Sequence, residues 1–123
     1  MLCNTDVLIY NILVKDCIFC KIVRREIPKE FAYEDKDIVA FEDLHPKTPV
    51  HLLVVPKKHV EDFFHSDAKT VEDITRGIKH LIDKEKLMGR GYTLEVNGGG
   101  FQIISHLHFH LMGPKGVYKP LDH

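Results

Sequence analysis

Three histidines alternate with three large apolar residues between His106 and Leu111, and no other pattern in the chain constrains the fold as strongly. Successive side chains of a β-strand point to opposite faces of the sheet, so this alternation predicts a strand with imidazoles on one face and apolar residues on the other. We predict that the stretch Gln102–Met112 forms the floor of a functional site. The alternative is a solvated strand face that happens to be rich in histidine. Repetition of one weak base instead favours metal binding, or nucleophilic and proton-transfer chemistry near neutral pH.

The size and charge of the chain exclude several classes of protein. Its 123 residues fit one domain. A net charge of −1 argues against a general nucleic-acid binder, and no apolar run reaches the length of a membrane span. Three cysteines are too few and too unevenly placed for a secreted disulfide scaffold, and residues 1–16 lack the features of a signal peptide. We therefore predict a cytoplasmic protein that binds neither nucleic acid nor membrane.

Apolar spacing and turn residues predict the order of the elements. Strands are predicted at residues 31–34, 38–41, 51–55 and 92–96, and 51–55 is apolar enough to be a central strand buried on both faces. A short helix is predicted over Cys17–Arg25. A long helix is predicted from about Ala68 to Met88, capped by Ser66 or Asp67 and closed by Gly89.

This order of elements, with the histidine strand, predicts an α+β fold built on a mainly antiparallel sheet with one long and one short helix. We divide the chain into an extension of undetermined role (1–16), one domain (17–116) and a C-terminal tail (117–123).

Cys17 and Cys20 have the Cys-x-x-Cys spacing that commonly places two thiolates on one tetrahedral metal ion. In a cytoplasmic chain this spacing favours metal binding over a disulfide. A redox dithiol has the same spacing, but such motifs lie between a strand and a helix, and no strand is predicted before Cys17.

The segment His106-Leu-His-Phe-His-Leu-Met112 resembles the His-φ-His-φ-His-φ-φ signature (φ, apolar) of the histidine triad superfamily of nucleotide hydrolases and transferases. Residues 17–28, 40–46 and 49–59 are similar to the family's other blocks, in the same order. The resemblance covers about residues 17–113 and is strongest to the Hint branch, whose members hydrolyse purine nucleoside phosphoramidates and aminoacyl adenylates. It implies a HIT-like fold, a homodimer and no organic cofactor.

The resemblance also implies catalytic roles for three histidines. His108 matches the family's nucleophile, which attacks the α-phosphorus and forms a nucleotidyl-histidine that water then hydrolyses to the nucleoside monophosphate. His110 matches the histidine that contacts the phosphate and the scissile-bond atom, and His51 matches one that faces the same phosphate. The chemistry agrees, because neutral imidazole is both a good nucleophile at pH 7 and a good leaving group from phosphorus.

Further positions match the family's substrate-binding residues. Asp43 matches the carboxylate that accepts hydrogen bonds from ribose, and Asn97 matches a loop asparagine that holds the phosphate or the leaving group. Gln102 matches the glutamine of a Gly-Gln-Ser segment before the triad. The apolar wall around the purine corresponds to Phe19, Ile22, Phe41 and Leu44. The alternative for Phe19, Ile22 and Phe41 is ordinary core packing.

The family comparison completes the metal site predicted from the two cysteines. Many bacterial members add the histidine of Pro-Lys-Lys-His and the first triad histidine, which correspond to His59 and His106. Two sulfur and two nitrogen ligands leave no open position, so the zinc would be structural. His65 is the main rival ligand.

The chain departs from the family where Phe101-Gln-Ile103 replaces Gly-Gln-Ser. Isoleucine cannot donate the hydrogen bond of the serine, and one such donor is worth about 2–4 kcal/mol at a transition state. Two alternatives to a phosphoramidate hydrolase therefore stay open. One is a dinucleoside polyphosphate hydrolase or nucleotidyl transferase, and the other is a zinc-stabilised nucleotide-binding or interaction module with little turnover.

Overall fold

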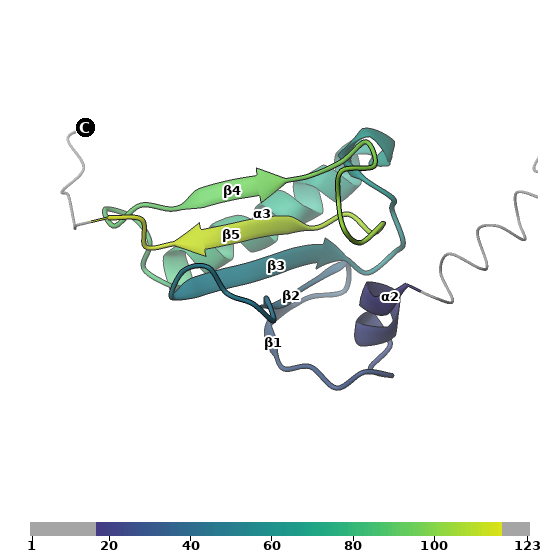
Figure 1. The fold of residues 1–123 in the computed structure, drawn as a ribbon, viewed down its shortest axis with the longest axis horizontal. Helices are drawn as coiled ribbons and strands as arrows, with labels where there is room; N and C mark the ends of the chain where they lie inside the picture. The colour runs from purple at the N-terminus through teal and green to yellow at the C-terminus, as the bar shows by residue number, and fades with distance from the viewer. Residues whose placement is uncertain (1–16, 117–123) are drawn as a thin grey trace, which may run out of the picture.

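A computed structural model describes residues 17–116 as a five-stranded sheet with two α-helices (Figure 1). The strand order is β1-β2-β3-β5-β4, and every neighbouring pair is antiparallel. The strands are β1 (Phe31–Glu34), β2 (Ile38–Glu42), β3 (Val50–Pro56), β4 (Thr93–Val96) and β5 (Phe109–Gly113). The helices are α2 (Ile18–Val23), a 3₁₀ turn η1 (Phe63–His65) and α3 (Ala68–Lys84). The predicted α+β architecture is confirmed, whereas the predictions for 1–16 and 117–123 lie outside the described residues.

Helix α3 covers one face of the sheet, which we call the α3 face (Figure 1). Its buried residues pack against alternate positions of β2, β3 and β5, because strand side chains alternate between faces. Gly77 lets the helix come close to β2, since a Cβ there would lie 2.2 Å from Ile38 Cδ1. The packed residues include Ile74, Ile78 and Leu81 of α3 with Ile38, Ala40, Leu52, Val54 and Leu111 of the sheet.

The opposite face, which we call the histidine face, carries His51, His106, His108 and His110 beside a second apolar cluster. Helix α2 closes this cluster, and its six residues are too few to form a stable helix without tertiary packing. The cluster joins Phe19 and Ile22 of α2 to Val39, Phe41, Leu53 and Val55 of the sheet. One sheet therefore separates a mainly apolar layer from a face that mixes apolar and ionisable groups.

Helix α3 ends at Lys84 instead of near Met88, so the prediction that Gly89 closes it is wrong. Lys86 adopts a left-handed conformation (φ 56°), the Leu87 N–H donates to Ile82 O at 3.0 Å, and the Lys86 N–H donates to Asp83 O at 3.1 Å. This is a Schellman ending with lysine in the position that usually holds glycine. Leu87 is fully buried, and its burial explains why the chain turns inward four residues early. At the other end Asp67, one of the two predicted candidates, is the cap, because its carboxylate accepts from the Thr70 N–H at 2.8 Å.

The predicted histidine strand is too long at its start, because β5 begins only at Phe109. Pairing with β3 stops at Val54 and Phe109, and the Leu107 N–H donates instead to the Val60 carbonyl at 2.6 Å. The alternation nevertheless persists through this irregular stretch. Leu107, Phe109 and Leu111 join the α3 face, and the intervening histidines lie on the other side, as predicted.

The remaining boundaries follow the predictions closely. Each of the first four predicted strands agrees with the structure within one residue at either end. Helix α2 ends at Val23, two residues earlier than predicted, and Arg25 follows with a positive φ of 62°. Among residues 17–116, no helix is long and apolar enough to cross a membrane.

Candidate active site and metal cluster

His108 is buried at the start of β5, and its backbone environment determines which ring nitrogen carries the proton. Its Nδ1 lies 2.8 Å from the carbonyl oxygen of His106. A carbonyl can only accept, so in the neutral ring Nδ1 is the donor and Nε2 keeps its lone pair. The structure therefore presents His108 in the tautomer that an attacking nitrogen at Nε2 requires.

His51 and His110 form a hydrogen-bonded pair from adjacent strands. The Lys47 N–H donates to His51 Nδ1 at 3.0 Å, so the proton of the neutral His51 ring is on Nε2. That Nε2–H faces His110 Nδ1 at 2.9 Å, which leaves the proton of His110 on its Nε2. The ring of His110 lies 5.1 Å from that of His108. His110 is thus a hydrogen-bond donor beside the ring of His108.

Burial lowers the pKa of His110, and the neighbouring His108 and His51 rings lower it further. The Asp43 and Glu95 carboxylates act in the opposite direction, with smaller effect. Since its ordinary value is 6.5, His110 is neutral at pH 7 and keeps both the donor and the acceptor described above.

Asp43 lies beside this histidine pair. Its Oδ2 is 3.5 Å from His51 Nε2 and 3.9 Å from His110 Nδ1. The spacing of the three groups would suit a metal ion. However, the Lys47 amide occupies the lone pair of His51 Nδ1, so Nε2 could bind a cation only by losing the last ring proton. We therefore interpret this group as a hydrogen-bond chain and not as a metal site.

A second group of side chains is arranged as ligands of one metal ion. Cys17 Sγ lies 3.3 Å from His106 Nδ1, and Cys20 Sγ lies 3.4 Å from His59 Nδ1 and 3.6 Å from His106 Nδ1. A tetrahedral zinc with ordinary Zn–S and Zn–N bonds separates its sulfur and nitrogen ligands by about 3.5 Å. The four predicted metal ligands thus come together with the right spacing, from α2, the turn after β3 and the approach to β5.

The protonation states of His106 and Cys20 also suit the binding of a cation. His106 Nε2 lies 2.8 Å from the Pro56 carbonyl, so its proton is on Nε2 and the Nδ1 lone pair faces both sulfurs. Burial lowers the pKa of His106 to about 4, which keeps the ring neutral. Burial, and next the Cys17 thiol, raise the pKa of Cys20 to about 12. A divalent ion would displace the proton of the Cys20 thiol, so this site could hold a metal ion.

The rival ligand His65 lies outside this cluster. Its side chain is 55% exposed, and its Nδ1 is 2.6 Å from Asp62 Oδ1. The geometry therefore favours His59 as the fourth member of the group.

The predicted apolar wall divides between buried and exposed positions. Phe19 is buried, with its ring 5.1 Å from His108 and 5.6 Å from Phe41, and Ile22 is buried with them. Leu44, by contrast, is 79% exposed on the loop after β2. Phe19 thus joins the apolar cluster to the catalytic candidate.

The loop residues make contacts mainly with their own surroundings. Asn97 Nδ2 donates to Glu95 Oε1 at 3.3 Å. Gln102 donates to the Glu61 carbonyl at 3.2 Å and accepts from the Gly100 N–H at 3.1 Å. Ile103, which stands where a serine was expected, is 98% exposed.

Several groups that shape the site were not predicted. The Lys47 amide and the carbonyls of Pro56 and His106 set the histidine tautomers, but every residue has such groups, so no side-chain pattern reveals them. The buried carboxylate of Asp62 was missed because one of its partners is the amide of Gly99, which only the fold brings near.

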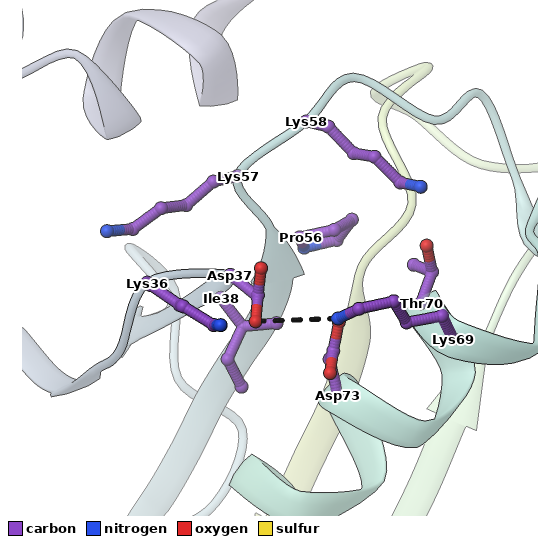
Figure 2. Close-up of a pocket in the computed structure, with 9 residues that line it drawn as sticks. All are labelled: Lys36, Asp37, Ile38, Pro56, Lys57, Lys58, Lys69, Thr70 and Asp73. Atoms are coloured by element: carbon purple, nitrogen blue, oxygen red, sulfur yellow. Dashed lines mark hydrogen bonds and ion pairs between the residues drawn. The ribbon is translucent and has the colours of Figure 1, made fainter.

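A cavity of about 320 Å³ lies away from the histidines, between the ends of β2 and β3 and the start of α3 (Figure 2). Lys36, Lys57, Lys58 and Lys69 surround it. Lys69 bridges Asp73 at 2.9 Å and Asp37 at 3.6 Å. Lys57 and Lys58 are paired with Glu34 and Asp67 outside the cavity. Its charge is therefore largely compensated, and the cavity is best understood as an ion-pair network joining α3 to the sheet.

Comparison with known proteins identifies relatives along most of the chain. The family described as "HIT domain" matches residues 24–117. An uncharacterised HIT-like protein from Methanocaldococcus jannaschii is 39% identical over 99 residues, which cover 78% of this chain and 77% of that protein.

Solved structures agree with this comparison. A HIT family hydrolase from Legionella pneumophila is similar with a TM-score of 0.74 and 40% identity, covering 80% of this chain and 92% of that one. A histidine triad nucleotide-binding protein from Candida albicans has a TM-score of 0.74 and 31% identity, covering 88% and 85%. The matched residues include all five strands and the three alternating histidines.

Proposed function

This chain belongs to the HIT domain family, and from that premise we propose that it is a nucleotide hydrolase that forms a nucleotidyl-histidine at His108. One observation carries the proposal. His108 donates through Nδ1 to the His106 carbonyl, so Nε2 has a free lone pair on the histidine face. The similarity to a HIT family hydrolase and to a histidine triad nucleotide-binding protein supports a nucleotide as the substrate.

The reaction proceeds in two displacements at phosphorus. In the first, His108 Nε2 attacks the α-phosphorus, a P–N bond forms, and the bond to the leaving group breaks with its electron pair. The His110 Nε2–H donates a hydrogen bond to that leaving group, which takes up a proton from water as it departs, and His51 holds the His110 ring in the donor tautomer. In the second, water attacks the phosphorus and displaces His108, releasing the nucleoside monophosphate. Donor imidazoles around the phosphoryl oxygens stabilise the charge that develops there.

We propose a purine nucleoside phosphoramidate or a related nucleotidyl conjugate as the substrate. Phe19, Ile22 and Phe41, with the exposed Leu44, would line the base. Asp43 is placed next to the histidine pair, where a carboxylate can accept from two ribose hydroxyls. Asn97 would reach the phosphate or leaving group from its loop, with Gln102 nearby in the sequence.

We also propose that Cys17, Cys20, His59 and His106 hold a structural zinc ion. Bound zinc would link α2 and the turn after β3 to the approach to β5, and it would take no part in the displacements. Because all four ligands come from the chain, no position is left for substrate. Metal content measured by elemental analysis tests this proposal, with loss of the ion expected in Cys17→Ser.

A homodimer completes the proposal. Strand β4 is an edge strand with Leu94 exposed (46%) and Tyr92 exposed just before it (40%), and the free backbone groups of such an edge can pair with a second chain. Sedimentation equilibrium of the full chain tests it, and a monomer at micromolar concentration would contradict it.

The decisive experiment is intact mass spectrometry after brief incubation with a lysine-linked adenosine phosphoramidate. We expect a covalent adenylyl adduct on the wild-type chain and none on His108→Ala. A parallel panel with diadenosine polyphosphates separates phosphoramidate from dinucleotide hydrolysis. Nucleotide binding without any adduct would instead indicate a binding module. This alternative has its own support in the sequence, because Ile103 lacks the hydrogen-bond donor of the family's serine.

A further inference from the structure

Asp62 is a buried carboxylate that the proposed reaction does not use. Its side chain is 5% exposed, in the turn between β3 and η1. Its Oδ2 accepts from the Gly99 N–H at 2.9 Å. Its Oδ1 accepts from the His65 N–H at 3.2 Å and lies 2.6 Å from His65 Nδ1. A buried charge with so many partners indicates a defined structural or functional task.

This carboxylate binds the glycine loop 98–100, which has little side-chain packing to fix its position. Gly99 and Gly100 have φ values of 66° and 91°, and a Cβ at either position would meet nothing within 4 Å. Glycine without packing neighbours loses much conformational entropy when it is ordered. The position of this loop therefore depends on its polar contacts, and the bond to Asp62 is the charged one.

The loop approaches Asp62 closely along its backbone. A Cβ on Gly98 would lie 3.4 Å from the Asp62 Cβ. The two residues before Asp62 hold the same segment further along, since Glu61 O accepts from Gln102 and Val60 O accepts from the Leu107 N–H at 2.6 Å. Residues 60–62, which follow β3, thus hold the segment from Gly98 to Leu107 in place.

The fastened segment has functional candidates at both ends. Asn97 immediately precedes it, and His108 immediately follows it. The Gly99 amide, and next the His65 ring, lower the pKa of Asp62, so the carboxylate is ionised at neutral pH. A displacement of the loop would move Asn97 relative to His108 without altering the apolar core.

We infer that Asp62 is a positioning residue, whose carboxylate holds the 98–100 loop so that Asn97 meets the leaving group of a nucleotide bound beside His108. The inference rests on the proposed hydrolase function and deepens it. Asp62 acts through Asn97, and Asn97 meets the leaving group alone, so the effect of Asp62 is confined to the step in which the leaving group departs.

The test compares Asp62→Asn with Asp67→Asn in the full chain. Both replace a carboxylate that accepts a backbone N–H, but Asp67 caps α3 and has no contact with the loop. Rapid-quench kinetics with the lysine-linked adenosine phosphoramidate measure formation of the nucleotidyl-histidine and its hydrolysis separately. Amide exchange at Gly99 and Gly100, followed by NMR, measures how firmly the loop is held.

In Asp62→Asn we expect adduct formation to slow by about 10- to 100-fold, the cost of a small misplacement of a positioning group. Hydrolysis of the adduct, from which the leaving group has already gone, should keep its wild-type rate. Amide exchange at Gly99 should accelerate, while Asp67→Asn should leave both the loop and adduct formation unchanged. A mere loss of folded protein would lower the amplitude of adduct formation and leave the rate constants of both steps unchanged.

Two results overturn the inference: unchanged exchange at Gly99 in Asp62→Asn, or faster exchange with unchanged adduct formation. If the wild-type chain forms no adduct, the proposed function fails as well. The exchange measurement then still decides whether Asp62 holds the loop, which distinguishes the two failures. Should Asp62→Asn fold poorly, Asp62→Glu, which keeps the charge, provides the second variant and should restore adduct formation relative to Asp62→Asn.

Discussion

The two faces of the sheet are built from the same strands but stabilised in different ways. On the α3 face, a 17-residue helix buries aliphatic side chains against alternate positions of β2, β3 and β5. On the histidine face, a six-residue helix is accompanied by four histidines and two buried cysteines. The comparison shows that side-chain alternation lets one set of strands supply a packed core and an ionisable site, each without disturbing the other.

Within the histidine face, backbone neighbours separate two similar-looking groups. The carbonyl of Pro56 accepts a hydrogen bond from the His106 Nε2–H, so the lone pair of His106 is on Nδ1, where a metal ion could bind. The backbone N–H of Lys47 donates a hydrogen bond to His51 Nδ1, so the ring proton of His51 is on Nε2. The same side chain therefore offers a lone pair in one place, where a metal ion could bind, and a hydrogen-bond donor in the other.

The largest difference between the faces should appear in activity. His108→Ala should lower the release of nucleoside monophosphate by at least about 10⁴-fold, because the nucleophile is lost. Phe109→Leu is the matched control, since it changes the next residue, which belongs to the α3 face. Steady-state kinetics on both variants measure the contrast, and retained turnover in His108→Ala would falsify the nucleophile assignment.

Removal of metal should destabilise the histidine face alone. If the free metal ion is present at about a thousand times its Kd, its removal by a chelator should lower the free energy of unfolding by about 4 kcal/mol. Cys20→Ser should have the same effect without chelator, whereas Cys3→Ser, which lies outside the described residues, should keep the ion. Elemental analysis and urea unfolding provide the measurements. A chain that unfolds identically with and without chelator would show that no structural metal is present.

A cavity on the α3 face should cost stability and leave the chemistry intact. Leu81 is fully buried, so Leu81→Ala should lower the free energy of unfolding by about 2–5 kcal/mol. Lys79→Ala, at an exposed position of the same helix, should change it by no more than about 0.5 kcal/mol. Denaturant titration measures both variants, and adduct formation per folded molecule should match the wild type. A large loss of adduct formation in Leu81→Ala would mean that the two faces are not independent.

The smallest effect should be on the pH profile. Protonated His110 cannot accept from the His51 Nε2–H, so activity should fall as the pH drops through the pKa of His110. Burial lowers that pKa, so the fall should lie below pH 6.5, the ordinary value for histidine. The Glu95 carboxylate, opposite His110 across β4 and β5, raises it. Glu95→Gln should therefore move the acid limb of kcat to lower pH. A shift to higher pH, or a profile independent of this charge, would contradict the assignment.

The alternating pattern predicted the sheet well because its cause is local. Strand positions, the faces of Leu107, Phe109 and Leu111, and the Asp67 cap all follow from side-chain period and capping chemistry. The end of α3 could not be predicted in this way, since the burial of Leu87 outweighs the helix pattern that continues past Lys84. The start of β5 was likewise decided by a distant carbonyl, that of Val60.

The sequence by itself determined the chemistry available to this protein: which residue types alternate, which thiols are paired by spacing, and which family the chain resembles. Only the tertiary structure decided how that chemistry is used. The tautomer of His106, the meeting of Cys17 with His106, and the hold of Asp62 on the glycine loop depend on groups far apart in the chain. Every residue carries the same N–H and C=O, so their effect on a side chain is set by position in the fold and cannot be read from residue identity.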